Sequence, residues 1–491
     1  MSQDKDKDEF LSIPCRGVLR GGLAGLATAM MVPGLGSCRR SGGGLAGQVS
    51  SSADGGFVGE NPDVWTKDAR TPDAELDAQV PQFEDADLSD AVADAQAKDA
   101  DSVDAMQDTG PDSGPDGGFG EDAGPSADFP SRNIPSAPSL VSLVPTLGVL
   151  GPSDSNGVRL PPGFSSRIVA RSGRTVGNTS HRWHLAPDGG ATYATEDGGW
   201  IYVSNSETYG FGGVGAIRFD QMGTIMDAYS ILGSTSGNCA GGKTPWHTWL
   251  SCEETTRGEV HECCPWGSQS AIVRPAMGSF KHEAVAVDPV NWHLYLTEDQ
   301  SNGRFYRFVP AAMNALGFPD LSSGQLEVAV VDMSGQVTWL AVPDPEYTGS
   351  TPTRTQVPSS TEFNGGEGIW YHDGTMYFST KGDNRVWAFD IANARMGIIY
   401  DGSGHLSGVD NVTVSCCGDV LVAEDGGSMQ IVAILPNGTL KTVVQVEGQG
   451  SSEITGPAFD PSGTRLYFSS QRGTGFGGIT YEITGPFHRP A

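Results

Sequence analysis

Short apolar segments that end in a small residue and then a polar side chain recur along the second half of the chain. They begin at positions 201, 248, 294, 376, 420 and 466, so successive starts are 47, 46, 82, 44 and 46 residues apart. Their sequences are IYVSNSE, TWLSCEE, LYLTEDQ, MYFSTKG, VLVAEDG and LYFSSQR. The long interval equals one unit plus an insertion. A repeating unit of about 45 residues is typical of a β-propeller, so six copies predict an all-β, six-bladed β-propeller.

Equivalent positions of a radial repeat lie at equivalent places around its axis. We therefore expect the fifth residue of each segment to join a ring at one end of the central channel: Asn205, Cys252, Glu298, Thr380, Glu424 and Ser470. Another polar residue precedes each of the last five segments, often beside glycines: Cys239, Glu283, Glu367, Asp410 and Glu453. Glycine is needed where backbones crowd together, so these residues are also expected near the axis.

The propeller is predicted to span residues 136–491, where alternating strands and Gly, Asp and Asn turns replace a polar, low-complexity sequence. The insertion covers about residues 316–362 and contains strand-like runs at 326–331 and 337–342. It is expected to cover one face of the central funnel. Residues 164–171 are expected to close the ring by pairing with the last blade.

Residues 1–38 resemble an export signal. Arg16 and Arg20 precede an apolar stretch from Leu23 to Val32, which is too short to span a bilayer as a permanent helix. The following Leu35-Gly36-Ser37-Cys38 resembles a bacterial lipoprotein cleavage box, with Cys38 as the lipidated residue. We expect an exported protein, a periplasmic or cell-surface lipoprotein whose membrane contact is an acyl anchor.

Residues 39–135 form a linker rich in Asp, Gly and Ala. Between Ser51 and Pro130 there are 21 acidic residues against three basic ones, a net charge of −18 out of −29 for the whole chain. Such a segment buries too little apolar surface to offset its ordering entropy, so it is predicted to be a disordered, solvated spacer. The acidic balance and the lack of a basic stripe argue against nucleic-acid binding.

Cysteine usage leaves two interpretations open. Cys15 and Cys38 belong to the signal segment, and six cysteines remain: Cys239, Cys252, Cys263, Cys264, Cys416 and Cys417. An even number in an exported domain permits disulfides of unknown connectivity. Cys252, however, stands beside carboxylates in Ser-Cys-Glu-Glu, which favours a metal ligand over a disulfide.

The acidic residues expected near the axis suggest a metal centre. The set comprises Cys252, Glu283, Glu298 or Asp299, Glu367, Asp410, Glu424 or Asp425, and Glu453. Carboxylates packed this closely repel one another unless a cation or protons neutralise them. Carboxylate oxygens suit calcium, and a thiolate suits iron or zinc. The alternative is that these acids cap strands and bind backbone amides in tight turns.

Several motifs of the repeat domain resemble the PhoX-type alkaline phosphatase family. They include GSFKHEAVAVDP from Gly278, LYLTED from Leu294, LSCEE from Leu250 and SEITGPAF from Ser452. The resemblance extends over about residues 160–483. It implies a six-bladed propeller whose axial cluster of ferric iron and calcium hydrolyses phosphate monoesters.

The resemblance also implies roles for individual residues. Cys252 and Glu283 resemble iron or bridging ligands, and Asn205 resembles a residue that contacts the phosphate. The full expected metal-binding set is Cys252, Glu253, Glu283, Asp299, Glu367, Asp410 and Glu453.

One departure from the family concerns the phosphate. The family carries Arg-Pro-Glu where this chain has Gly365-Gly366-Glu367, and the missing Arg would bind phosphate through its planar fork. Lys381 or Arg385 is expected to replace it, with Arg472 as a further candidate.

Three functions follow from these features. The first is an exported, metal-dependent hydrolase of small phosphate monoesters, expected to act as a monomer. The second is a calcium-dependent lactonase or esterase on a similar propeller, in which Cys252 has no role. The third is a non-catalytic binding propeller that keeps metals for stability. The thiolate favours the first, and Gly365 favours the other two.

Overall fold

The computed structural model describes residues 139–450, 452–474 and 477–491. The signal segment and the acidic linker predicted for residues 1–38 and 39–135 lie outside these residues, as does the predicted start of the domain at residue 136. Among the residues described, no helix has the length and apolar character needed to cross a membrane.

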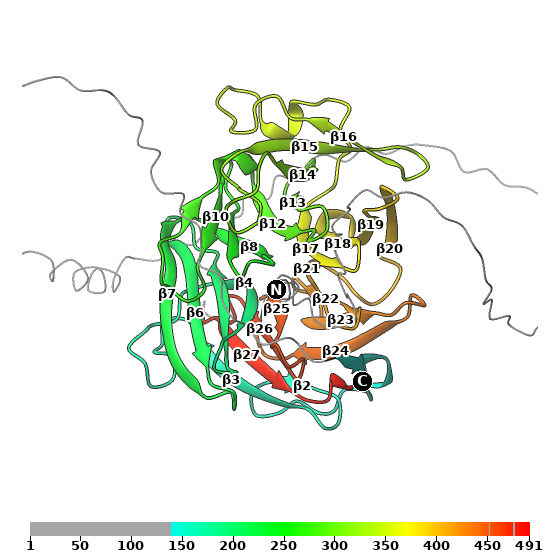
Figure 1. Cartoon of the computed structure of the whole chain (residues 1–491). Helices are drawn as coiled ribbons and strands as arrows, with labels where there is room; N and C mark the ends of the chain where they lie inside the picture. Colours follow the sequence, from blue (N-terminus) through cyan, green and yellow to red (C-terminus); the bar gives the residue numbers. More distant parts are fainter. Residues whose placement is uncertain (1–138, 451, 475–476) are drawn as a thin grey trace, which may run out of the picture. The chain divides into compact units, whose positions relative to one another are not determined.

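Six antiparallel sheets surround a central axis (Figure 1), which confirms the predicted all-β, six-bladed propeller. The first two blades are β4 (Pro187–Ala194), β5 (Trp200–Ser206), β6 (Gly212–Phe219) and β7 (Ile225–Thr235), then β8 (Asn238–Lys243), β9 (Trp249–Glu253), β10 (Val260–Cys263) and β11 (Ile272–Val273). The third is β12 (His282–Val287), β13 (Leu294–Glu298), β14 (Phe305–Pro310), β15 (Gly324–Val331) and β16 (Val337–Ala341). The fourth is β17 (Gly366–His372), β18 (Thr375–Thr380), β19 (Arg385–Asp390) and β20 (Arg395–Tyr400).

The last two blades each include a strand from the beginning of the described chain. Blade 5 joins β21 (Val409–Val414), β22 (Val420–Glu424), β23 (Gln430–Ile434) and β24 (Leu440–Val446) to β2 (Val158–Arg159). Blade 6 joins β25 (Ile454–Phe459), β26 (Arg465–Ser470) and β27 (Ile479–Thr484) to β3 (Ser165–Arg171). The pairing of β3 with β27 confirms the predicted ring closure. A two-stranded ribbon of β1 (Leu140–Ser142) and β28 (His488–Pro490) completes the fold.

In the part of the chain that the structure describes, four short 3₁₀ helices connect the strands. They are η1 (Val144–Thr146), η2 (Pro275–Met277), η3 (Thr353–Thr355) and η4 (Lys381–Asp383).

The innermost strand of each blade is its first strand. β4, β8, β12, β17, β21 and β25 pack against one another in a closed ring around the axis. The repeated segments of the sequence are β5, β9, β13, β18, β22 and β26, each the second strand of its blade. The ring expected from the fifth residue of each repeat therefore lies one strand further from the axis than predicted.

Close packing at the axis depends on glycine. Gly242 on β8 faces the carbonyl of Val285 on β12, and Gly189 on β4 faces the backbone of Ala240 on β8; a Cβ atom at either glycine would overlap these atoms. Apolar residues fill the spaces between neighbouring blades, as in the cluster of Leu250, Val285 and Tyr306.

The insertion in the third interval extends blade 3 outward. β15 is the fourth strand of this blade and β16 is an additional fifth strand. The loop that follows β16 returns toward the axial end of β13, where Arg354 lies 3.4 Å from the carboxylate of Glu298. The insertion thus adds an outer strand and a loop at the blade edge, where the sequence predicted a cover over the funnel.

Candidate metal and phosphate site

A β-bulge at the start of the innermost strands places one side chain per blade at the axis. In blades 1 to 5 the register shifts directly after the first pair of each strand, and in blade 6 it shifts one pair later. A bulge re-aims side chains and is common near functional sites. The residue that follows the first paired position in each blade defines what we call the inner column: Asp188, Cys239, Glu283, Glu367, Asp410 and Thr455.

The residue directly after each second strand defines an outer column. Its members are Glu207, Glu254, Asp299, Lys381, Asp425 and Gln471. Glu453 precedes β25 and bridges to Asp425, which adds another acid beside this column. The outer column is the true sixfold feature of the sequence repeat, one or two residues beyond the position used to predict the ring.

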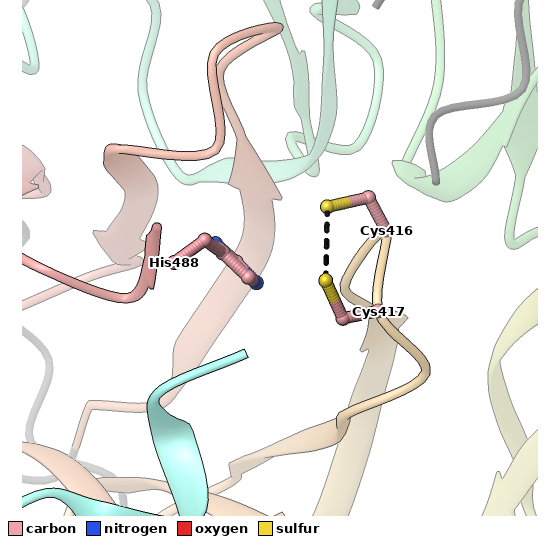
Figure 2. Close-up of side chains that lie close together, drawn as sticks. All are labelled: Cys416, Cys417 and His488. Atoms are coloured by element: carbon pink, nitrogen blue, oxygen red, sulfur yellow. Dashed lines mark hydrogen bonds between the residues drawn. The ribbon is translucent and has the colours of Figure 1, made fainter. Parts of the chain in front are cut away.

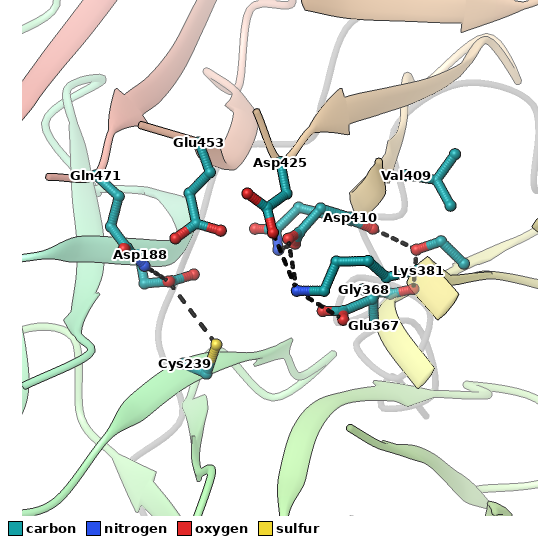
Figure 3. Close-up of polar contacts among 12 residues, drawn as sticks. Asp188, Cys239, Glu367, Gly368, Lys381, Val409, Asp410, Asp425, Glu453 and Gln471 are labelled. Carbon is teal, nitrogen blue, oxygen red and sulfur yellow. Dashed lines mark hydrogen bonds and ion pairs between the residues drawn. The ribbon is translucent and has the colours of Figure 1, made fainter. Parts of the chain in front are cut away.

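Ligand-type atoms gather into three groups within this site, two of which share Asp410, and the atoms of each group lie within 4.8 Å of one another. The groups are Glu207, Cys239 and Glu254; Glu283, Glu367 and Asp410; and Asp410, Asp425 and Glu453. Figure 3 shows Glu367, Asp410, Asp425 and Glu453 of the second and third groups, with Asp188 and Cys239 facing them.

Lys381 lies among the carboxylates of blades 4 and 5 (Figure 3). Its Nζ is 2.9 Å from Glu367 Oε1, 3.3 Å from Asp425 Oδ2 and 3.5 Å from Asp410 Oδ2. Burial lowers the pKa of Lys381, but attraction to Asp410 and Glu367 outweighs burial and raises it, so the amine stays charged. The sequence-based expectation that Lys381 reaches the axis agrees with this placement.

Two further cations enter from neighbouring blades. Lys281 Nζ lies 2.7 Å from Glu254 Oε1. Arg472 pairs with Glu207 and, at 2.6 Å, with Glu453. Gln471 donates hydrogen bonds from its amide to Asp188 and, at 2.8 Å, to Glu207.

Negative charge still exceeds positive charge in this site. The carboxyl groups are Asp188, Glu207, Glu254, Glu283, Asp299, Glu367, Asp410, Asp425 and Glu453, against the cations Lys281, Lys381 and Arg472. The Oε1 atom of Glu283 is buried and has no hydrogen-bond partner. An unpartnered carboxylate oxygen in such surroundings is a place for a proton or a metal ion.

The pKa shifts agree with this excess of negative charge. Burial raises the pKa of Glu283, and the charge of Glu367 raises it further. Burial, followed by Asp410, raises the pKa of Glu453 to about 8. Burial also raises the pKa of the Cys239 thiol. These groups hold protons at neutral pH unless a cation replaces the protons.

Several residues predicted for the site have other surroundings. Asn205 is fully buried, where its amide donates to the carbonyls of Cys239 and Ala240 while its oxygen accepts from Trp249 and Ser251. It therefore ties blade 1 to blade 2, with its hydrogen-bonding groups already used.

Cys252 and Glu253 also lie away from the inner column. Cys252 is buried in the apolar cluster between blades 2 and 3. Glu253 accepts hydrogen bonds from the backbone of Ser236 and Glu259 and lies 3.5 Å from His261. The thiol that the structure places among the acids is that of Cys239.

Arg385 is separate from the site as well. It starts β19, forms a 2.9 Å ion pair with Asp383, and has 41% of its side chain exposed. Of the three cations proposed to replace the missing Arg, Lys381 and Arg472 are therefore in the site.

Sequence reasoning missed three acids and one thiol of the site. Asp188 stands 13 residues before the first repeated segment, at the spacing of Glu453 before the last, so the repeat itself could have revealed it. Glu207 and Glu254 end the first two repeated segments. Cys239 was expected near the axis but not as a ligand.

The fold and this site define the class of protein: a six-bladed β-propeller with an acid-lined axial centre. A family model described as "Alkaline phosphatase PhoX" matches residues 220–271 and 259–403. Over these residues the chain is similar to the PhoX family, so the resemblance predicted from its motifs is confirmed.

Solved structures share the architecture. Pseudomonas fluorescens PhoX in complex with vanadate, described as a transition-state analogue, is 16% identical with a TM-score of 0.57, and the match covers 69% of this chain and 98% of that one. A Xanthomonas campestris gluconolactonase is 11% identical with a TM-score of 0.42, covering 74% and 99%. A Bacteroides thetaiotaomicron protein of unknown function is 10% identical with a TM-score of 0.42, covering 68% and 84%. No curated protein matches the chain.

Proposed function

We propose that the chain is an exported, metal-dependent phosphatase that hydrolyses small phosphate monoesters at the axial site. The observation that carries the proposal is the convergence of acids from all around a PhoX-like propeller onto one axis, with Lys381 and Arg472 among them. Export rests on the signal-like sequence of residues 1–38.

The side chains present fit a metal centre of the kind the family implies. Glu283, Glu367 and Asp410 offer clustered carboxylates suited to calcium, and Glu283 has a buried oxygen without a partner. Cys239, beside Glu207 and Glu254, offers a thiol that suits iron once it is deprotonated. Bound metal would neutralise charge on the phosphoryl group and activate water.

The cations of the chain would bind and orient the phosphate. Arg472 has the fork geometry for two phosphate oxygens, and Lys381 supplies a point charge beside Glu367 and Asp410. In the structure both are held by carboxylates. Metal ions on those carboxylates would take over the neutralising role and leave the two cations to the substrate.

The backbone conformation at Gly365 disfavours a side chain at this position. Its φ is +69°, in the left-handed region that disfavours side chains, and a Cβ atom would lie 3.3 Å from Asp299 Oδ1. Lys381 Cβ lies 3.8 Å from the same point. Lys381 therefore brings a cation to the neighbourhood that the missing Arg would have occupied.

Hydrolysis of p-nitrophenyl phosphate by metal-loaded, full-length protein tests the proposal. Lys381→Ala is expected to lower kcat/KM. The fall should correspond to a loss of about 1–3 kcal/mol of transition-state stabilisation, the range of a hydrogen bond to a charged group. Arg385→Ala, which removes a cation from the same blade but outside the site, is the matched control and should retain activity. Equal activity in both variants would remove Lys381 from catalysis.

One observation favours a second function. Lys381 already contacts three carboxylates, as a bound cation would. The alternative is a non-catalytic binding propeller in which this lysine replaces a metal ion. A protein that takes up no metal ion at the axial acids and does not hydrolyse p-nitrophenyl phosphate would favour this alternative over the phosphatase.

A further inference from the structure

A second cluster of metal-ligand side chains lies at the other end of β21 from the axial acids. Asp410 is near the start of β21, whereas Cys416 and Cys417 lie in the turn after its end, before β22. His488 begins β28, and its ring nitrogen and the two sulfur atoms all lie within 4.8 Å of one another. Figure 2 shows the imidazole pointing toward the two sulfurs.

The tautomer of His488 leaves one nitrogen available for a ligand. Nδ1 lies 2.7 Å from the carbonyl oxygen of Gly463. Because a carbonyl only accepts, Nδ1 carries a proton, and Nε2 presents a lone pair when the ring is neutral. Nε2 is buried without a hydrogen-bond partner, and the whole side chain is inaccessible to solvent. Metal-binding histidines are commonly oriented by such a bond from the other nitrogen to a backbone carbonyl.

The separation of the two sulfur atoms suits a tetrahedral ion. Sγ of Cys416 and Sγ of Cys417 are 3.7 Å apart. Zinc–sulfur bonds of about 2.3 Å at a tetrahedral angle place two sulfurs about 3.8 Å apart, whereas a disulfide requires about 2.05 Å. The observed spacing therefore matches two ligands of one zinc ion.

The surroundings of these three side chains contribute a carboxylate and an adjacent cavity. Asp419 Oδ2 lies 3.6 Å from His488 Nε2, and hydrogen bonds from Ser415 and Ser142 fix this carboxylate. Cys416 also lines a cavity of about 190 Å³ at this end of the channel.

We propose that Cys416, Cys417 and His488 form a structural zinc site, separate from the axial centre. Binding of Zn²⁺ by the two thiols would release two protons and leave two thiolates and a neutral imidazole as ligands. The ion would join the turn of blade 5 to the β1–β28 ribbon, in which His488 pairs with Ser142. Zinc would thus fasten both ends of the described chain to the propeller.

Cobalt titration of the reduced, full-length protein tests this site, because tetrahedral cobalt with thiolate ligands gives charge-transfer and visible bands that carboxylate sites lack. We expect these bands in the wild type, their loss on adding one equivalent of zinc, and a higher Tm with zinc. His488→Asn should lose both effects, since Asn can still donate to Gly463 but lacks Nε2. The double variant Cys416→Ser/Cys417→Ser should lose them too.

Cys239→Ser is the control for the only cysteine found among the axial acids of the described chain. This variant should keep the cobalt bands and the zinc-dependent rise in Tm. Bands that disappear in Cys239→Ser but persist in His488→Asn would overturn the proposal and assign the thiolate signal to the axial site. Mass spectrometry that finds Cys416 and Cys417 joined in a disulfide in the purified protein would also overturn it.

Discussion

Removal of the Lys381 charge should destabilise the metal-free protein in a way that depends on pH. Lys381→Met keeps most of the aliphatic chain but leaves Glu367, Asp410 and Asp425 without their shared cation. Stranding a buried charge costs about 3–5 kcal/mol. Lys381 retains 33% exposure of its side chain, so water screens part of this cost and we expect a loss of about 2–3 kcal/mol at pH 8.

Protonation of one carboxylate limits that loss. A carboxyl group with an ordinary pKa near 4.5 takes up a proton at a cost of about 1.4 kcal/mol per pH unit above its pKa. The limit is therefore about 5 kcal/mol at pH 8 but only about 1.4 kcal/mol at pH 5.5. The destabilisation by Lys381→Met should shrink accordingly on acidification.

Urea unfolding of chelator-treated, full-length protein at the two pH values measures this effect. Arg385→Met is the control, because its exposed ion pair with Asp383 should contribute about 0–1 kcal/mol at either pH. A loss for Lys381→Met that equals that of the control at pH 8, or one that does not change with pH, would refute the reasoning.

Three more predictions follow from the site and its supporting strands. Gly242→Ala should cost about 2–3 kcal/mol or more in unfolding measurements because its Cβ overlaps a backbone carbonyl, whereas Gly397→Ala, with open space around its Cβ, should stay within about 0.5 kcal/mol. The Tm of the metal-free protein should fall from pH 5 to pH 8, because the folded-state pKa of Glu453 is raised to about 8 and its stabilising proton is lost as pH rises through that value; a Tm that rises over this range would be the wrong sign. Metal analysis should show less bound metal in Cys239→Ser, while Cys252→Ser should lose stability by about 1–3 kcal/mol and keep its metal; the reverse result would return the ligand role to Cys252.

The repeat spacing was sufficient to predict the fold because six copies of one unit have few other ways to bury their apolar faces. The same repeat predicted the neighbourhood of the site, including Glu283, Glu367 and Asp410. The repeat did not predict the position of the ring of fifth residues correctly, because the repeated segment is the second strand of each blade and not the innermost one. Its fifth residue is Asn205 in blade 1 and Cys252 in blade 2, and both side chains are fully buried away from the axial acids.

The spacing of the repeated segments could not predict which individual side chains join the axial acids. Which cysteine joins the acids depends on the bulge at the start of β8, which re-aims Cys239. The difference between Lys381 and Arg385 depends on a turn: Lys381 follows β18 directly, whereas Arg385 starts the next strand and faces Asp383. Neither the bulge nor this turn has a clear signal in the local sequence.

Metal content and phosphatase activity measured on the same samples of full-length protein test the central claim most directly. The account predicts bound calcium and iron, hydrolysis of p-nitrophenyl phosphate, and loss of both metal and activity in Glu283→Gln, which alters the unpartnered carboxylate at the axis. A wild-type protein that remains metal-free after exposure to calcium and iron, or a Glu283→Gln variant with unchanged metal content and activity, would contradict the claim that the axial acids are a catalytic metal centre.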